Sequence, residues 1–263
     1  GVFFTLMNFG VKYLENIPAI EIVLFRSIVS LVISAIMIKQ MGLSFLGNNK
    51  TVLFLRGFFG VVALSLYFFT LQKLPFASAV TIMQLSPIFT TILAIFILKE
   101  VVKAPQWLFF LVSFVGVALI KGFNPDIPLK YFMLALLSTF FSALAYNMVR
   151  KLKDSDHPIV VVFYFPLVAL PFAGILSYFQ WVQPSWTEFL ILLGIGIATQ
   201  IAQVNMTKAM QLEELGKVSI VGYLTMVYAL FIGAIFFKET YNWITLVGMG
   251  LVIAGVLLNL RFT

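Results

Sequence analysis

The sequence predicts an all-α polytopic membrane protein with ten transmembrane helices in two inverted five-helix repeats. Three observations predict this fold class: the apolar content, a series of long apolar segments and an internal repeat. Of the 263 residues, 62% are apolar and 10% are charged, whereas soluble domains carry about 25% charged residues. An ordinary soluble enzyme is therefore excluded, because its surface needs far more charge.

Ten apolar segments, separated by charged residues, Pro, Gly and Asn, are the candidate membrane spans. Most of them approach the ~20 residues with which a helix crosses a bilayer. They are 1–14, 20–40, 52–72, 76–98, 105–121, 129–149, 158–180, 187–209, 217–237 and 241–260. The first is too short to span, so we expect that further residues precede it in the natural chain.

Prolines help to define these segments. Pro105 and Pro158 stand in the first turn of their segments, where a missing N–H costs nothing. Pro87, Pro166 and Pro171 lie inside segments, where proline kinks or breaks a helix. We therefore expect the fourth and seventh spans to be irregular.

The distribution of cationic residues predicts the orientation in the membrane. If both termini lie in the cytoplasm, the inner loops hold most of the 17 Lys and Arg residues, with Arg56 counted among them. Cytoplasmic loops are enriched in these residues. We expect a multi-pass protein of the inner (plasma) membrane with both termini inside.

The chain resembles itself at an offset of 139 residues, at which Lys99-Glu100 aligns with Lys238-Glu239. Each half then holds five spans, and because five is odd the second half enters the membrane from the opposite side. Inverted repeats are a common plan of secondary transporters. The predicted domains are residues 1–123 and 124–263.

A series of short motifs, repeated more loosely in the second half, carries a family resemblance. The motifs in the first half are Arg56-Gly57, Tyr67 to Pro75, Ala77 to Val80, Ser86 to Phe89 and Leu98-Lys99-Glu100. With them the chain resembles the EamA-like branch of the drug/metabolite transporter superfamily. The resemblance implies a central cavity lined by the first, third, fourth, sixth, eighth and ninth spans, and it places the second span at the periphery.

Polar side chains inside the spans are the candidate substrate-binding residues, because polar groups facing lipid are costly. The candidates are Asn8, Tyr67, Thr81, Gln84, Asn147, Gln200, Gln203 and Tyr223. Spacing puts Gln200 and Gln203 on one helix face, and the repeat aligns Gln84 with Tyr223. The alternatives are hydrogen bonds between helices for the amides, buried packing for the fourth and ninth spans, and an interfacial anchor for Tyr67.

Charged residues near and within the spans suggest two further roles. Lys99-Glu100 and Lys238-Glu239 end their helices at opposite faces, where a carboxylate opposes the helix dipole and needs a cationic partner. We predict an ion-pair latch at each gate, with ordinary loop charge as the alternative. Arg26 lies well inside a span, at a cost of ~2.5–3.5 kcal/mol if unpaired. It could bind an anionic substrate, but the peripheral place implied for its helix favours a structural role.

The expected function is secondary transport of a small organic metabolite, such as an amino acid or a nucleoside-like or drug-like solute, by alternating access. The cavity is expected to be neutral and rich in amides and aromatic rings. The alternatives are a lipid or isoprenoid-phosphate flippase and a membrane-embedded enzyme. The enzyme is disfavoured because no acidic or His cluster occurs.

The composition also limits cofactors and partners. With no Cys and one His, we expect neither a metal site nor a cofactor. The cationic residues are dispersed between apolar segments, which argues against nucleic-acid binding. The expected partners are the small-molecule substrate and the lipid bilayer, and a homodimer is left open.

Overall fold

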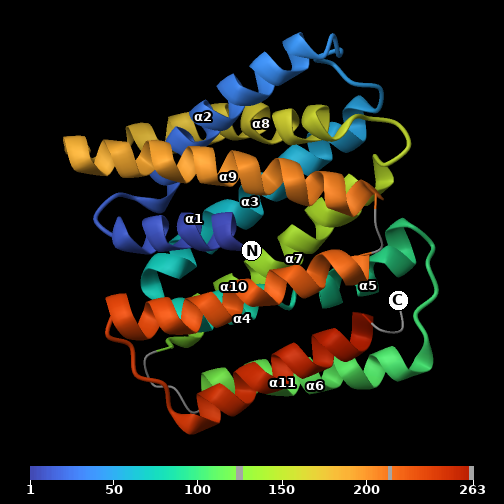
Figure 1. Ribbon diagram of the computed structural model, residues 1–263, viewed down its shortest axis with the longest axis vertical. Coiled ribbons are helices and arrows are strands. Elements are labelled where there is room, and N and C mark those ends of the chain that lie inside the picture. Colours follow the sequence, from blue (N-terminus) through green and yellow to red (C-terminus); the bar gives the residue numbers. More distant parts are fainter. Residues whose placement is uncertain (123–126, 213–214, 261–263) are drawn as a thin grey trace.

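The computed structural model describes residues 1–122, 127–212 and 215–260. At residues 122, 215–223 and 259–260 it describes the backbone alone. Eleven α-helices and no strands occur in these residues (Figure 1). The helices are α1 Val2–Tyr13, α2 Ala19–Gln40, α3 Lys50–Lys73, α4 Phe76–Met83, α5 Ser86–Ile97, α6 Ala104–Gly122, α7 Leu129–Lys151, α8 Pro158–Tyr178, α9 Trp186–Leu212, α10 Leu215–Phe236 and α11 Trp243–Leu260.

The helices α4 and α5 are the two halves of the fourth predicted span. Pro87 stands in the first turn of α5 and has no N–H to continue a helix from α4. Gln84 and Leu85 separate the two halves and close tight turns onto Thr81 and Ile82. The expected break at Pro87 is confirmed, and the eleven helices therefore form ten segments in the described residues.

The seventh span does not break at its prolines, although a break was one of the two outcomes expected there. Pro166 and Pro171 both lie within α8, which remains one helix from Pro158 to Tyr178. This helix packs against α2 and α3. A proline inside a span therefore does not by itself break the helix.

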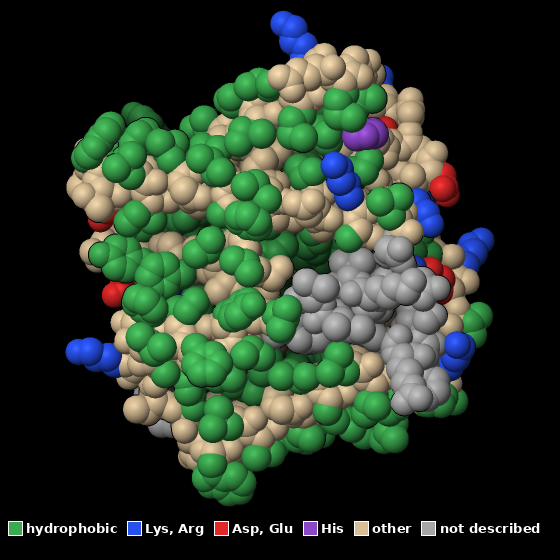
Figure 2. All heavy atoms as spheres, in the orientation of Figure 1, with side chains coloured by type: hydrophobic (Ala, Val, Ile, Leu, Met, Phe, Trp, Pro, Cys, Tyr) green, Lys and Arg blue, Asp and Glu red, His purple; other side chains and the backbone are tan. Residues whose placement is uncertain are grey.

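The surface of the bundle agrees with a polytopic membrane protein. Seven helical segments, counting α4 with α5 as Phe76–Ile97, are long and apolar enough to cross a membrane, and shorter apolar stretches occur at Leu224–Phe236 and Trp243–Leu258. Figure 2 shows apolar side chains across the visible face, with most charged side chains toward its margins. The predicted all-α membrane fold is confirmed.

The closest helix pairs join the first half of the chain to the second. These pairs are α6 with α11, α3 with α7, α2 with α8, α2 with α9, α3 with α8, α1 with α9, α5 with α7 and α4 with α10. Figure 1 shows α6 and α11 along one edge of the bundle, and α2 and α8 along the opposite edge. The contact between the halves therefore extends from one edge of the bundle to the other (Figure 1).

The ends of α5 and α10 have matching backbone geometry. Lys99 and Lys238 both adopt the left-handed conformation, with φ of 58° and 52°. The next residue donates its N–H back into the helix in both cases, from Glu100 to Ala94 and from Glu239 to Gly233. This left-handed helix end recurs at the offset of the predicted repeat. The predicted boundary between residues 123 and 124 lies outside the described residues.

Candidate functional site

A cavity of about 400 Å³ lies between the two halves of the chain. Its size suits a small organic ligand. The lining residues come from α1, α3, α4, α5, α7, α9 and α10, together with one residue of α2 and one of α8. The spans named by the family resemblance all contribute, and the second and seventh spans contribute as well.

Four of the residues predicted from sequence line this cavity: Asn8, Tyr67, Gln84 and Gln203. Gln84 reaches it from the break between α4 and α5. The Asn8 side chain lies near the Tyr67 hydroxyl, and its carbonyl oxygen has no hydrogen-bond partner among the described residues. The polar groups of the cavity thus come from both halves.

Three other candidates are not brought to the cavity and make hydrogen bonds elsewhere. Asn147 donates to the carbonyl oxygens of Thr90 and Ala143, at 3.0 and 3.1 Å. The Gln200 amide donates to the Ser34 hydroxyl at 2.8 Å. The Thr81 hydroxyl donates to a carbonyl of its own helix at 2.7 Å. The side chain of Tyr223, the remaining candidate, lies outside the described residues.

The charge of the cavity differs from the expectation. Arg26 and Arg56 both line it, and both are buried, with 3% and 2% of their surfaces exposed. Neither forms an ion pair with a carboxylate in the described part of the chain. The cavity is therefore cationic, not neutral. Arg26 reaches the cavity from α2, which lies at the edge of the bundle as expected (Figure 1), and Arg56 lies within α3, not in a loop.

Phe165 on α8 lies beside both arginines. The Arg26 guanidinium is 4.5 Å from the centre of its ring, and the Arg56 guanidinium is 5.9 Å from it. Gly60, one turn after Arg56, leaves the space that this arrangement needs, because a Cβ there would overlap Arg56 Nη1 and the Phe165 ring. The sequence did contain a signal for Arg56, since it lies inside the apolar segment 52–72.

One of the two predicted gates carries an ion pair. Glu100, after α5, pairs with Arg150 in the last turn of α7. Lys99 beside it is exposed. The expected ion pair is thus present at this end, but its cation comes from a different helix.

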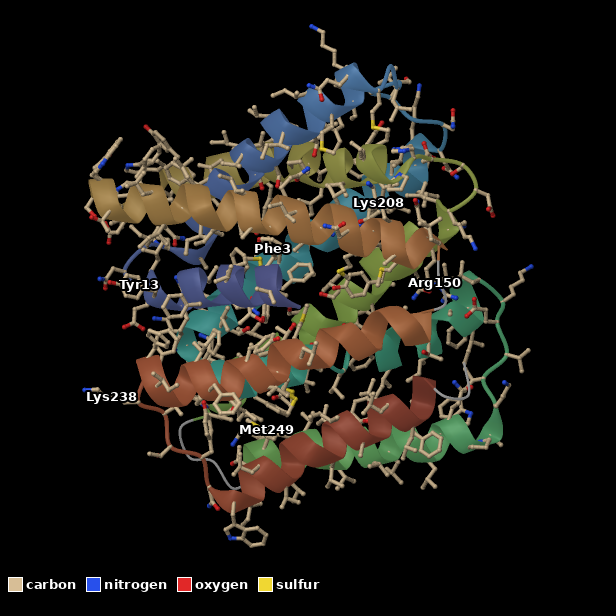
Figure 3. All side chains as sticks on the ribbon, in the orientation of Figure 1. Phe3, Tyr13, Arg150, Lys208, Lys238 and Met249 are labelled. Atoms are coloured by element: carbon tan, nitrogen blue, oxygen red, sulfur yellow. The ribbon has the colours of Figure 1, made fainter. Side chains whose placement is uncertain are left out.

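The other predicted gate uses hydrogen bonds. The carboxylate of Glu239 accepts the backbone N–H of Phe76 at 2.6 Å and the hydroxyl of Tyr241 at 2.8 Å. Burial and this carboxylate raise the pKa of Tyr241, in the connection between α10 and α11, above its usual range, so the phenol stays a neutral donor. Lys238 points away from the bundle, at the end opposite to Arg150 (Figure 3).

Apolar helices around a cavity with several polar lining residues are typical of a polytopic membrane transporter. The sequence profile of the EamA-like transporter family matches residues 1–122 and again residues 129–261. The chain belongs to this family, as its motifs predicted.

Several transporters are similar to this chain over most of its length. The pseudopaline exporter CntI of Pseudomonas aeruginosa is 29% identical over 255 residues, which cover 96% of this chain and 90% of the exporter. Human solute carrier family 35 member G1 is 29% identical over 97% of this chain and 77% of the human protein. The S-adenosylmethionine uptake transporter of Rickettsia conorii is 25% identical over 94% of this chain and 84% of the Rickettsia protein. These relatives support a small-molecule transporter.

A crystal structure also matches this fold. The two chains superpose with a TM-score of 0.70 at 16% sequence identity, over 97% of this chain and 93% of the other. At this identity the match shows the fold alone.

Proposed function

We propose that this protein is a secondary transporter that moves a small organic metabolite across the membrane by alternating access through the central cavity. The observation that carries the proposal is the position of the cavity between the two halves, with polar groups from both. A relative movement of the halves would change access to such a cavity without moving the binding groups far.

The two ends of the bundle support this mechanism. Glu239 ties the end of α10, in the second half, to the start of α4 in the first half. At the opposite end, Glu100 of the first half pairs with Arg150 of the second. Each contact joins the two halves near one membrane face, so breaking one and keeping the other would open the cavity at one end.

Several properties of the transporter stay predictions. These are residence in the plasma membrane with both termini in the cytoplasm, assembly as a homodimer, and the binding roles of Asn8, Tyr67, Gln84 and Gln203.

Single cysteines test alternating access, because the chain has no Cys of its own. Ala63→Cys and Ala209→Cys place a thiol on the cavity wall from α3 and α9. Ala173→Cys is the control, because Ala173 is fully buried in α8 away from the cavity. A membrane-impermeant maleimide is applied to right-side-out and to inside-out vesicles.

We expect both cavity thiols to react from each side of the membrane and the Ala173→Cys thiol to react from neither. Bound substrate should change the ratio of the two labelling rates, because it shifts the populations of the two states. Labelling of the cavity thiols from one side alone, with or without a metabolite mixture, would contradict alternating access.

A further inference from the structure

We propose that Arg26 and Arg56 form a binding subsite for an oxyanion, so that the substrate of this transporter is a small organic anion with a carboxylate or phosphate group. This inference rests on the proposed function, because it assigns a chemical class to the solute in the central cavity. Two cationic side chains from different helices meet there at one aromatic ring.

The two guanidinium groups retain unused hydrogen-bond donors. Nε and Nη1 of Arg26 and Nε of Arg56 are buried and have no hydrogen-bond partner in the part of the chain that the structure describes. Each arginine carries five N–H donors and no acceptor. A buried charge without a partner is strongly unfavourable. An anionic ligand in the cavity would supply the missing partner.

The protein itself supplies no competing carboxylate at this place. The side chains that line the cavity include no Asp or Glu among the described residues. The ion pair present in the described residues joins Glu100 to Arg150 at the end of the bundle. The positive charge of Arg26 and Arg56 is therefore left for the substrate.

Phe165 and Gly60 hold the two guanidinium groups in place. A guanidinium over an aromatic ring uses its face for the cation–π contact and keeps its edge N–H groups for an anion. Arg26 lies over Phe165 in this way. The missing side chain of Gly60 leaves room for Arg56 next to the same ring. Such edges bind the two oxygens of a carboxylate or phosphate together.

The remainder of the cavity suits an organic body attached to the anion. Tyr67, Tyr146 and Phe165 supply aromatic surface, and Gln84 and Gln203 supply amide groups. These groups bind an aromatic or amphipathic body by stacking and hydrogen bonds. An inorganic ion alone would leave most of the 400 Å³ unfilled.

Binding of matched probes to the purified protein tests the proposal. Benzoate and phenyl phosphate carry an oxyanion on the same ring, and benzamide is the neutral counterpart of benzoate. We expect both anions to raise the unfolding temperature of the wild-type protein, since a ligand of the folded state stabilises it by mass action. Benzamide should give no such rise. Absence of stabilisation by both anions would overturn the proposal.

Substitution of each arginine locates the site. Arg26→Gln and Arg56→Gln should each weaken binding of the anionic probes about tenfold or more. Lys208→Gln, which removes the same charge from an exposed position on α9 (labelled in Figure 3), should leave binding unchanged. Without ligand, both Arg→Gln variants should unfold at or above the wild-type temperature, because each removes a buried unpaired charge. Unchanged probe binding in both would overturn the proposal.

A further binding measurement, with a lipid, distinguishes a small soluble anion from a lipid headgroup as the source of the oxyanion. Stabilisation by phosphatidylglycerol that Arg26→Gln abolishes, without stabilisation by benzoate or phenyl phosphate, would overturn a small-solute site and favour a flippase. Cysteine labelling separates this inference from the proposed function. Two-sided labelling without anion binding removes the anion inference alone, whereas anion binding with one-sided labelling removes alternating access.

Discussion

The carboxylate of Glu239 accepts the backbone N–H of Phe76 at 2.6 Å, across 163 positions of sequence. Phe76 is the first residue of α4, and the preceding Pro75 offers no side-chain cap. Glu239 thus takes the place of an N-cap residue from outside the helix. Its negative charge also lies at the positive end of the α4 dipole.

Glu239→Ala should open this end of the bundle. Loss of an N-cap side chain typically costs about 1 kcal/mol, which corresponds to about a fivefold change in the ratio of two states. We expect the Ala63→Cys thiol to react several times faster with an impermeant maleimide applied from the face at which α10 ends. Thr240→Ala, at an exposed neighbouring position, is the control and should not change the rate. An equal rate in Glu239→Ala and Thr240→Ala would rule out a latch here.

The ion pair of Glu100 with Arg150 should contribute less to the unfolding free energy than its close contact suggests. The two side chains are 40% and 20% exposed, so water and salt screen their attraction. Pairs of this kind contribute about 0.2–1 kcal/mol. A double-mutant cycle with Glu100→Gln and Arg150→Gln, read out by chemical unfolding in detergent, should give a coupling energy in this range that falls with added salt. A salt-independent coupling above about 2 kcal/mol would contradict this view.

Asn147 and Gln203 were both predicted as binding residues because they are amides inside apolar spans, but their replacement by alanine should have different effects. Asn147→Ala leaves the carbonyls of Thr90 and Ala143 without their donor, and we expect a loss of about 1–3 kcal/mol in unfolding free energy. Gln203→Ala changes the cavity wall, so it should keep the unfolding temperature and weaken the thermal shift given by a bound metabolite. A destabilised Gln203→Ala with unchanged ligand response would reverse the two assignments.

This contrast shows what sequence could and could not predict about the site. An amide inside an apolar span has to find a polar partner, and the pattern identifies such amides correctly. Whether the partner is a neighbouring helix, as for Gln200 with Ser34, or a cavity, as for Gln203, depends on helix rotation. Rotation is set by packing against helices distant in sequence, which a single segment does not reveal.

The spans themselves were predictable because each needs a long apolar run, and the break at Pro87 followed from its missing N–H. The place of two arginines at the cavity was not predicted. The sequence identified Arg26 as a charge inside a span, but the peripheral place of its helix favoured a structural role, and Arg56 was counted by charge alone as a loop residue. Both lie within apolar segments, and the signal that identified Arg26, an arginine flanked by apolar residues on both sides, would have identified Arg56 as well.

Gly248 and Gly250 both lie on α11, but only Gly248 lies against α6, so substitutions of the two glycines can be compared directly. A Cβ at Gly248 would lie 2.6 Å from the carbonyl oxygen of Gly116, whereas a Cβ at Gly250 would meet nothing within 4 Å. Backbone cannot give way as a side chain can, so Gly248→Ala must push the two helices apart, at about 1–3 kcal/mol. Gly250→Ala should instead be neutral or stabilise by up to about 1 kcal/mol, because alanine favours the helix. Unfolding temperatures of the two variants in the same detergent measure the difference, and equal values would mean that α6 and α11 do not approach at Gly116.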